Sequence, residues 1–308
     1  MTGKKRVSSI VIGAALPVLV LLIWHIFGVK GRLNEALLPS LTTTVKKAVE
    51  LIADGSLLEN IFVSLGRVMK GFAIGASLGI VIGVLMGLFR PIYKFLNPTV
   101  AFLRSIPMMA LIPLFILWLG IGESCKVALI ALGSFWSVLL NTIHGVQSVD
   151  PKLVEVTTVL EKKPLTVLTR VYLPSALPAI ITGLRLGMGT AWACVVAAEM
   201  MAASKGVGYM IMFARELSQP DKLMVGIFSV GVIGLLIDQI MLFIQRRVLW
   251  WNSDKQTAAK KKSRFLHTRP VKQETAREGR STVHILSETR ENGETIENRK
   301  RRMETAKP

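Results

Sequence analysis

Residues 150–192 read DPKLVEVTTVLEKKPLTVLTRVYLPSALPAIITGLRLGMGTAW, and this stretch decides how the rest of the chain folds. Its polar first half carries charges of both signs and leads through Pro174 and Pro178 into an apolar block. Almost all of the chain on either side, up to residue 250, is apolar enough for the interior of a bilayer. A polar segment held between membrane spans, on the side rich in Lys and Arg, is accessible to a cytoplasmic protein.

The composition is that of a membrane protein. Hydrophobic residues make up 51% of the 308 residues, and the mean hydropathy is positive. They occur in runs of about 20 residues, the length that a helix needs to cross a hydrocarbon core about 30 Å thick. The net charge of +18 does not indicate nucleic-acid binding, because 15 Lys and Arg against 8 Asp and Glu lie from Asp254 onward and the remaining excess flanks the apolar runs.

The apolar runs predict an all-α, polytopic membrane protein with about six transmembrane helices. The predicted spans are residues 8–28, 61–89, 102–119, 126–143, 176–198 and 223–244. Basic residues at 4–6 precede the first run, which has no cleavage site and is therefore predicted to be retained. An even number of spans, together with the distribution of Lys and Arg, predicts that both termini are cytoplasmic.

Three segments lie outside the predicted spans. Residues 42–53 are amphipathic and follow a Leu-Pro-Ser turn, which predicts a Ser- or Thr-capped helix on the outer surface. Residues 202–222 are predicted to form a polar outer connection. Residues 254–308 have few apolar residues and alternating charges, so we predict a disordered cytoplasmic tail after a transmembrane domain at 1–253.

The second predicted span carries a glycine at every fourth position. These residues are Gly71, Gly75, Gly79, Gly83 and Gly87. Small residues at this spacing form one smooth helix face, on which another helix backbone can pack closely in lipid. We therefore predict tight packing within the bundle, while a glycine face that lines a translocation pathway is the alternative interpretation.

The third predicted span contains Pro107 and Pro113. Two prolines six residues apart remove several backbone hydrogen bonds. At membrane depth, a broken helix is stable only where it is buried in protein or lines a cavity. Residues 102–119 are thus the first candidate for a pathway wall, although an ordinary kinked helix fits equally well.

A few charged or aromatic residues in the spans are candidates for function, because ionisable groups are rare at that depth. The candidate pathway residues are Arg104, Pro107, Pro113, Trp118 and Glu199. Arg185 lies near the cytoplasmic end of its span, and Asp238 is predicted to be a buried acid without a partner.

No motif for catalysis or cofactor binding is found in the sequence. It has no phosphate-binding loop, no spaced set of metal ligands and no nucleophile elbow. The sequence therefore predicts neither an enzyme nor a cofactor bound by this chain, and transport against a gradient would need energy from another protein.

Residues 150–192 resemble the permease subunits of bacterial ABC importers. The cytoplasmic loop of that family runs Glu-Ala-Ala, then a Gly, then Ile-x-Leu-Pro. Glu155 occupies the acid position here, and residues 171–174 supply the ending. Val156 and Thr157 replace the two alanines, and Glu161 stands where the family usually has Gly, although Pro164 could still separate two short helices.

Segments 104–107, 111–114, 117–122, 198–200 and 206–209 resemble the branch of the family that imports aliphatic sulfonates, taurine or nitrate. The resemblance implies a type I importer permease fold in the bacterial inner membrane, with a second permease copy, two cytoplasmic ATPase subunits that hold ATP and Mg, and an extracytoplasmic binding protein. It also implies that the ATPase contacts the loop at 150–174. The loop residues concerned are Glu155, Val156, Thr157, Thr158, Val159, Leu160, Glu161 and Pro174.

Two other classes of membrane protein remain as alternatives. An ion-gradient-driven secondary transporter would need paired acids and bases near the midplane. A membrane assembly protein would need neither a proline-broken span nor a polar loop at this spacing. The residues themselves do not identify a substrate.

Overall fold

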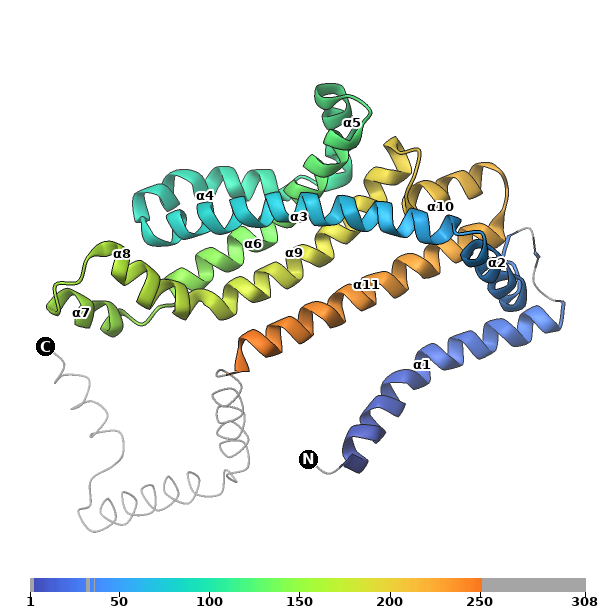
Figure 1. Cartoon of the computed structure of the whole chain (residues 1–308), viewed down its shortest axis with the longest axis horizontal. Coiled ribbons are helices and arrows are strands. Elements are labelled where there is room, and N and C mark those ends of the chain that lie inside the picture. Colours follow the sequence, from blue (N-terminus) through green and yellow to red (C-terminus); the bar gives the residue numbers. More distant parts are fainter. Residues whose placement is uncertain (1–2, 32–33, 36, 251–308) are drawn as a thin grey trace, which may run out of the picture. The chain divides into compact units, whose positions relative to one another are not determined.

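A computed structural model describes residues 3–31, 34–35 and 37–250, so the predicted tail at 254–308 lies outside the described residues. The described part is helical and contains no β-strand. Its helices are α1 (Gly3–Val29), α2 (Leu41–Ala53), α3 (Ser56–Leu88), α4 (Arg90–Ser105), α5 (Met108–Leu119), α6 (Glu123–Gln147), α7 (Pro151–Val159), α8 (Pro164–Val167), a π-helical turn (Leu168–Tyr172), α9 (Leu173–Ala202), α10 (Val207–Glu216) and α11 (Pro220–Val248) (Figure 1).

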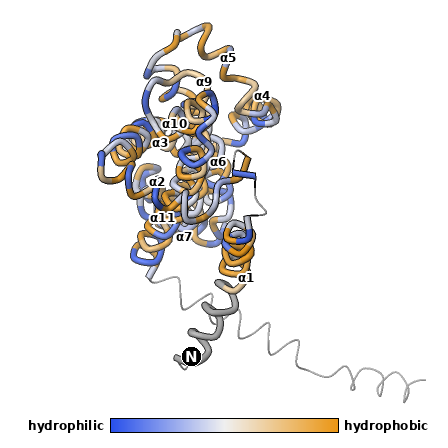
Figure 2. The backbone as a smooth tube through the Cα atoms, turned by 90° about the vertical axis from the view of Figure 1, so that its right-hand side faces the viewer, coloured by the Kyte–Doolittle hydropathy of each residue, from blue (hydrophilic) through white to orange (hydrophobic). Residues whose placement is uncertain are grey.

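Four helical segments are long and apolar enough to cross a membrane. They are Ser56–Leu88, Glu123–Gln147, Pro164–Ala202 and Pro220–Val248. The pair α4 and α5 makes a fifth crossing if it is counted as one span. In α1, only Val18–Val29 stands out as a shorter apolar helix, and Figure 2 shows the coloured part of α1 as mostly hydrophobic. The predicted count of six is therefore not reached within the described residues.

Residues 102–119 form a broken helix, and the alternative interpretation as an ordinary kinked helix is wrong. The helix stops at Ser105, and α5 leaves α4 at a bend of 97°. Ile106 is extended (ψ 122°), as steric contact with the Pro107 ring favours, and Pro107 offers no backbone N–H to continue the helix. Since α5 has 12 residues, it extends for only about 18 Å and is too short to cross a bilayer alone.

Helix α6 lies at the centre of the core, between α3 and α9. The five glycines of α3 contact α6 residues that are also four apart, from Ile130 through Ser134, Val138 and Thr142 to Val146. Both series ascend together, so α3 and α6 run parallel. On its other side, α6 meets Gly183 and Gly187 of α9. Small residues thus allow three backbones to approach closely, as van der Waals packing in lipid requires.

The two connections at residues 42–53 and 202–222, outside the predicted spans, contain more structure than the sequence suggested. Ser40 caps α2 by accepting a hydrogen bond from the Thr43 backbone N–H (3.2 Å), which confirms the predicted cap. The segment 202–222, predicted to be a polar connection, instead contains α10. A hydrophobic cluster holds α10 against α2, α3 and α11, and its buried members are Leu51, Leu57, Val207, Met210, Ile211 and Val225.

A buried aromatic residue of α9 contributes to the attachment of α11. The indole N–H of Trp192 donates to the backbone oxygen of Val230 (3.0 Å), and its ring lies beside Gly234. The rest of α11 is largely exposed and apolar within the protomer, which is compatible with a face toward lipid.

Candidate functional site

The loop between α6 and α9 folds as two short helices. Asp150 accepts a hydrogen bond from the Lys152 backbone N–H (3.0 Å) at the start of α7, and Pro151 occupies its first position. Pro164 opens α8, as predicted, because a first-turn residue needs no backbone N–H. The chain then passes through the π-helical turn directly into α9, where Pro174 lies in the first turn. The loop is therefore continuous with a membrane span.

Glu161 adopts the conformation for which the resembling family uses glycine. Its φ angle is +49°, in the left-handed region, and the backbone N–H of Lys162 closes the end of α7 by donating to the Thr157 oxygen (3.1 Å). A residue with a Cβ costs about 1–2 kcal/mol there. The turn between the two helices is thus present despite the substitution, and its shape does not depend on glycine.

One face of this loop is apolar and exposed. The side chain of Val159 is 82% exposed and that of Leu165 is 71% exposed, and further exposed members are Leu153, Val156 and Leu160. The side chain of Thr158 is not described, whereas Thr157 is half-buried and its hydroxyl donates to the Val154 oxygen (2.7 Å). Apolar patches that protrude from a protein into water are typical of binding surfaces.

A cavity of about 770 Å³ lies beside the same loop. Glu155 and Tyr172 line it from the loop, and Arg90 and Lys94 line it from the start of α4. Within the described part of the chain, the Glu155 side chain forms no hydrogen bond or ion pair. Its carboxylate is therefore free to accept a charge-assisted hydrogen bond from a basic side chain of another protein.

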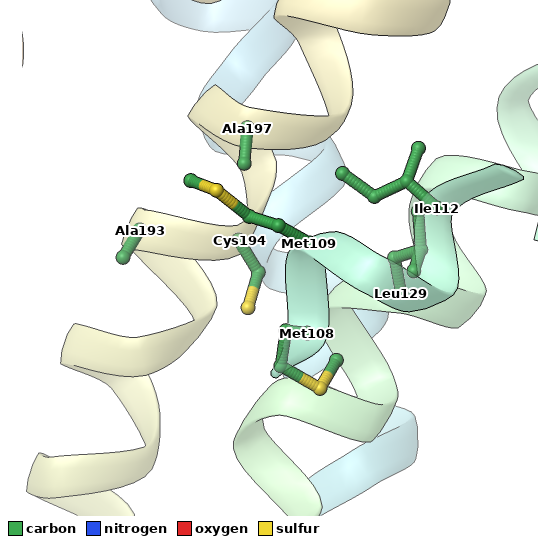
Figure 3. Close-up of a pocket in the computed structure, with 7 residues that line it drawn as sticks. All are labelled: Met108, Met109, Ile112, Leu129, Ala193, Cys194 and Ala197. Atoms are coloured by element: carbon green, nitrogen blue, oxygen red, sulfur yellow. The ribbon is translucent and has the colours of Figure 1, made fainter. Parts of the chain in front are cut away.

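The break between α4 and α5 borders two further cavities. One, of about 150 Å³, is apolar; Figure 3 shows Met108 and Met109 of α5 opposite Ala193, Cys194 and Ala197 of α9. The other, of about 330 Å³, adjoins it and is lined by Arg104 together with residues of α6 and α9. Pro107 forms the bend, Pro113 lies inside α5, and Trp118 is exposed beside Phe115.

Glu199 is placed in a buried network at the other end of α9. The residue is 1% exposed, and its carboxylate accepts hydrogen bonds from Arg67 Nη1 (2.7 Å) and Ser64 Oγ (2.8 Å) of α3. The backbone N–H of Gly208 adds a third (3.0 Å). A Cβ at Gly206 (φ +120°) would collide with this carboxylate, so glycine is required there.

Arg67 links this network to α6. Its guanidinium donates to both oxygens of Glu123 (2.6 and 2.8 Å), and Lys126 donates to the same carboxylate (2.9 Å). Arg67 also donates to the backbone oxygen of Lys205 (2.6 Å). A bidentate pair fixes geometry as well as charge, so one arginine joins α3, α6 and α9 at this end of the bundle.

Comparison with known proteins identifies this arrangement of helices. Residues 75–250 match the family described as binding-protein-dependent transport system inner membrane component. The chain belongs to this family of transport permeases.

Curated relatives agree with that assignment. The SsuC protein of Bacillus subtilis, named as a candidate aliphatic sulfonates transport permease, is 42% identical over 82% of this chain and 91% of its own length. The taurine transport system permease protein TauC of Escherichia coli is 36% identical over 66% and 74%. The bicarbonate transport system permease protein CmpB of Synechococcus elongatus is 32% identical over 74% and 86%.

Solved structures show the same fold for the permease. An inward-facing form of the MetNI methionine ABC transporter superposes with a TM-score of 0.55 at 18% identity, over 63% of this chain and 94% of that one. An amino acid ABC transporter crystallised with histidines gives 0.54 at 16% identity, over 65% and 97%. The permease is therefore an all-α ABC importer subunit of the membrane, as its sequence predicted.

The structure of the permease contradicts the prediction made for Asp238. This residue is not a buried acid without a partner: Arg185 Nε and Nη2 donate to its two carboxylate oxygens (2.8 and 3.0 Å), and the side chains are 31% and 46% exposed respectively. The partner was missed because α9 and α11 meet only in three dimensions.

The sequence analysis also did not predict Arg67 and Glu123 as site residues of the permease. A signal was available for Arg67, because a guanidinium inside the apolar run 61–89 needs a carboxylate partner. Glu199 was the other visible charge of opposite sign, and it was predicted to lie at a similar depth in its span. Glu123, in contrast, is indistinguishable by sequence from a solvated loop residue.

Proposed function

We propose that this permease forms the transmembrane pathway of an importer for a small anion, such as an aliphatic sulfonate, taurine or nitrate. Two cytoplasmic ATPase subunits bind and hydrolyse ATP with Mg, this chain binds no cofactor, and an extracytoplasmic binding protein delivers the substrate. A second copy of the permease completes the pathway in the bacterial inner membrane, with both termini in the cytoplasm.

The observation that carries the proposal is the exposed apolar face of the loop at 150–174. Val156 and Val159 on α7 and Leu165 on α8 expose large apolar side chains beyond the ends of α6 and α9. In a cleft of an ATPase these side chains would be removed from water, at about 25 cal/mol per Å² of buried area. Glu155 supplies a charged contact beside them, which favours one orientation.

The connections of the loop explain how such a partner would act on the pathway. Helix α7 follows α6 after a short turn, and α8 continues through the π-helical turn into α9. Both spans pack against each other through glycines, so they are expected to move as a unit. Closure of two ATPases on ATP would thus shift the bundle between discrete inward-open and outward-open arrangements.

The names of the relatives support a small anion as the substrate. Sulfonates, taurine and bicarbonate each carry a negatively charged oxygen group, and the relatives named for them cover most of this chain. The exposed apolar residues of α5 support the presence of a second permease copy. They are Met109, Leu117 and Trp118. A broken helix at membrane depth needs protein or a water-filled cavity beside it.

The test is to reverse the charge of Glu155 in the complete transporter. Glu155→Lys is expected to remain in the membrane, lose at least tenfold in retention of the cognate ATPase during purification, and lose ATP-dependent uptake in proteoliposomes. Glu216→Lys is the control, because Glu216 is an exposed acid at the end of α10. This variant should retain the ATPase during purification and should keep ATP-dependent uptake. Normal uptake by Glu155→Lys, or uptake by the wild type that continues without ATP, would contradict the proposal.

A further inference from the structure

Arg104 lies about halfway along the bundle and has no partner among the residues that the structure describes. It is exposed in the single chain and lies about 21 Å along α4 from Arg90, at 1.5 Å per residue. The cavity it lines also contains Gly133, about 15 Å from the start of α6, and Thr190, about 26 Å from the start of α9. These distances place the cavity in the middle of the crossing helices.

No described residue of the protein neutralises the charge of Arg104. Arg67 and Arg185 each bind carboxylates within the bundle, whereas the side chain of Arg104 forms no ion pair or hydrogen bond with any described residue. A guanidinium at this depth is costly when it has no counter-charge. Substrate sites of transporters commonly lie near the midplane at broken helices, and Arg104 immediately precedes the 97° break.

Two further groups in the same cavity can donate hydrogen bonds. Ser137 and Trp136 both line it, and neither the Ser137 hydroxyl nor the Trp136 indole N–H has a partner in the part of the chain that the structure describes. Thr190 differs, because its hydroxyl already donates to the backbone oxygens of Gly133 and Gly187 (3.1 and 2.9 Å). One planar cation and two neutral donors match an oxyanion group.

The adjoining cavity adds an apolar compartment. It shares Met108, Ala193 and Cys194 with the cavity of Arg104 and extends toward Met109 and Ala197 (Figure 3). Its volume of about 150 Å³ is sufficient for a short alkyl chain. An inorganic anion has no apolar part to place there, so it gains nothing from this second cavity.

We infer that these two cavities form one substrate site for a small organic oxyanion, with the charged group on Arg104, Ser137 and Trp136 and the alkyl chain between Met108 and Met109. The inference rests on the proposed function and narrows its substrate class. It assigns Arg104 as the anion ligand of the pathway and predicts preference for alkyl sulfonates over inorganic anions.

The test measures binding of radiolabelled ethanesulfonate to the permease–ATPase complex in nanodiscs, without a binding protein. Arg104→Gln is expected to weaken binding at least tenfold and Ser137→Ala about threefold, while Arg104→Lys retains part of it. Lys70→Gln is the control, because Lys70 is an exposed cation on α3 that lines neither cavity and should leave binding unchanged. Nitrate should displace ethanesulfonate only at concentrations at least tenfold higher than unlabelled ethanesulfonate.

Wild-type affinity of Arg104→Gln would overturn the site, and equal displacement by nitrate would overturn the organic preference. ATP-dependent uptake of ethanesulfonate by proteoliposomes that contain the full transporter separates this inference from the proposed function. Uptake without Arg104-dependent binding refutes the site and leaves the importer intact. Arg104-dependent binding without uptake supports the site and contradicts the proposed import.

Discussion

Replacement of Gly75 by alanine tests the packing of α3 on α6 most directly. A Cβ at this position would collide with the backbone oxygen of Ala131 and with the hydroxyl of Ser134. A hydroxyl can rotate away, but a backbone carbonyl inside a helix cannot. The two helices would therefore have to separate by about an ångström, which disturbs every contact along their shared face.

The expected cost follows from the neighbours at each glycine. Overpacking of a well-packed interior costs about 1–3 kcal/mol, and Gly75→Ala should reach the upper end because the obstacle is backbone. Gly79→Ala should cost less, because its Cβ would lie 3.0 Å from Val138 Cβ and 3.1 Å from the Phe135 oxygen. Gly79→Leu adds a branched side chain against the same residues and should disrupt assembly of the transporter.

Gly66→Ala is the matched control on the same helix. A Cβ at Gly66 would have no atom within 4 Å, so this change should stabilise α3 by about 0.5–1 kcal/mol through helix propensity. The measurement is the free energy of unfolding in mixed micelles, together with recovery of the assembled complex. Equal stability of Gly75→Ala and Gly66→Ala would refute the argument that backbone contact sets the distance between α3 and α6.

Three further predictions follow from single contacts. Glu161→Gly should stabilise the loop by about 0.5–1 kcal/mol, because glycine adopts the left-handed backbone conformation without strain. The greater conformational entropy of glycine in the unfolded chain offsets part of the gain. Slower hydrogen exchange at the loop would show the stabilisation. Arg67→Gln should destabilise the permease by about 3–5 kcal/mol, because it leaves the Glu199 carboxylate buried and unpaired. The double variant with Glu199→Gln should recover part of that loss in a double-mutant cycle, and additive effects would contradict the pairing. Exchange of Arg185 and Asp238 in one double variant should restore the thermal stability that each single exchange loses, and no rescue would mean that the ion pair does not join α9 to α11.

Local chemistry made the helices predictable from the sequence. The cap at Ser40 and the opening of α8 by Pro164 depend on neighbours only a few residues away, and both were predicted correctly. The long spans α3, α6, α9 and α11 follow from hydrophobic runs alone. The existence of a break at Pro107 was also readable, because proline cannot continue a helix.

The direction of that break and the pairing of charges were not predictable in the same way. Whether a proline kinks a helix or turns it by 97° depends on what lies beside it, and here α5 packs over α6 and α9. Arg67 and Glu199 are 132 residues apart in sequence, and Arg185 and Asp238 are 53 apart. Hydropathy shows that each charge needs a partner but does not say which one.

The contacts between the helices indicate where motion can occur. At one end, Arg67 joins α3, α6 and α9 through two carboxylates, and along their length the glycine contacts hold the three helices together. The pair α4 and α5 lacks such ties, because α4 has no buried residue and α5 buries only Ile112. A force applied at the loop would thus move α6 and α9 as one body against α4 and α5. The cavity of Arg104 lies between these two bodies, so its shape should change when the loop moves.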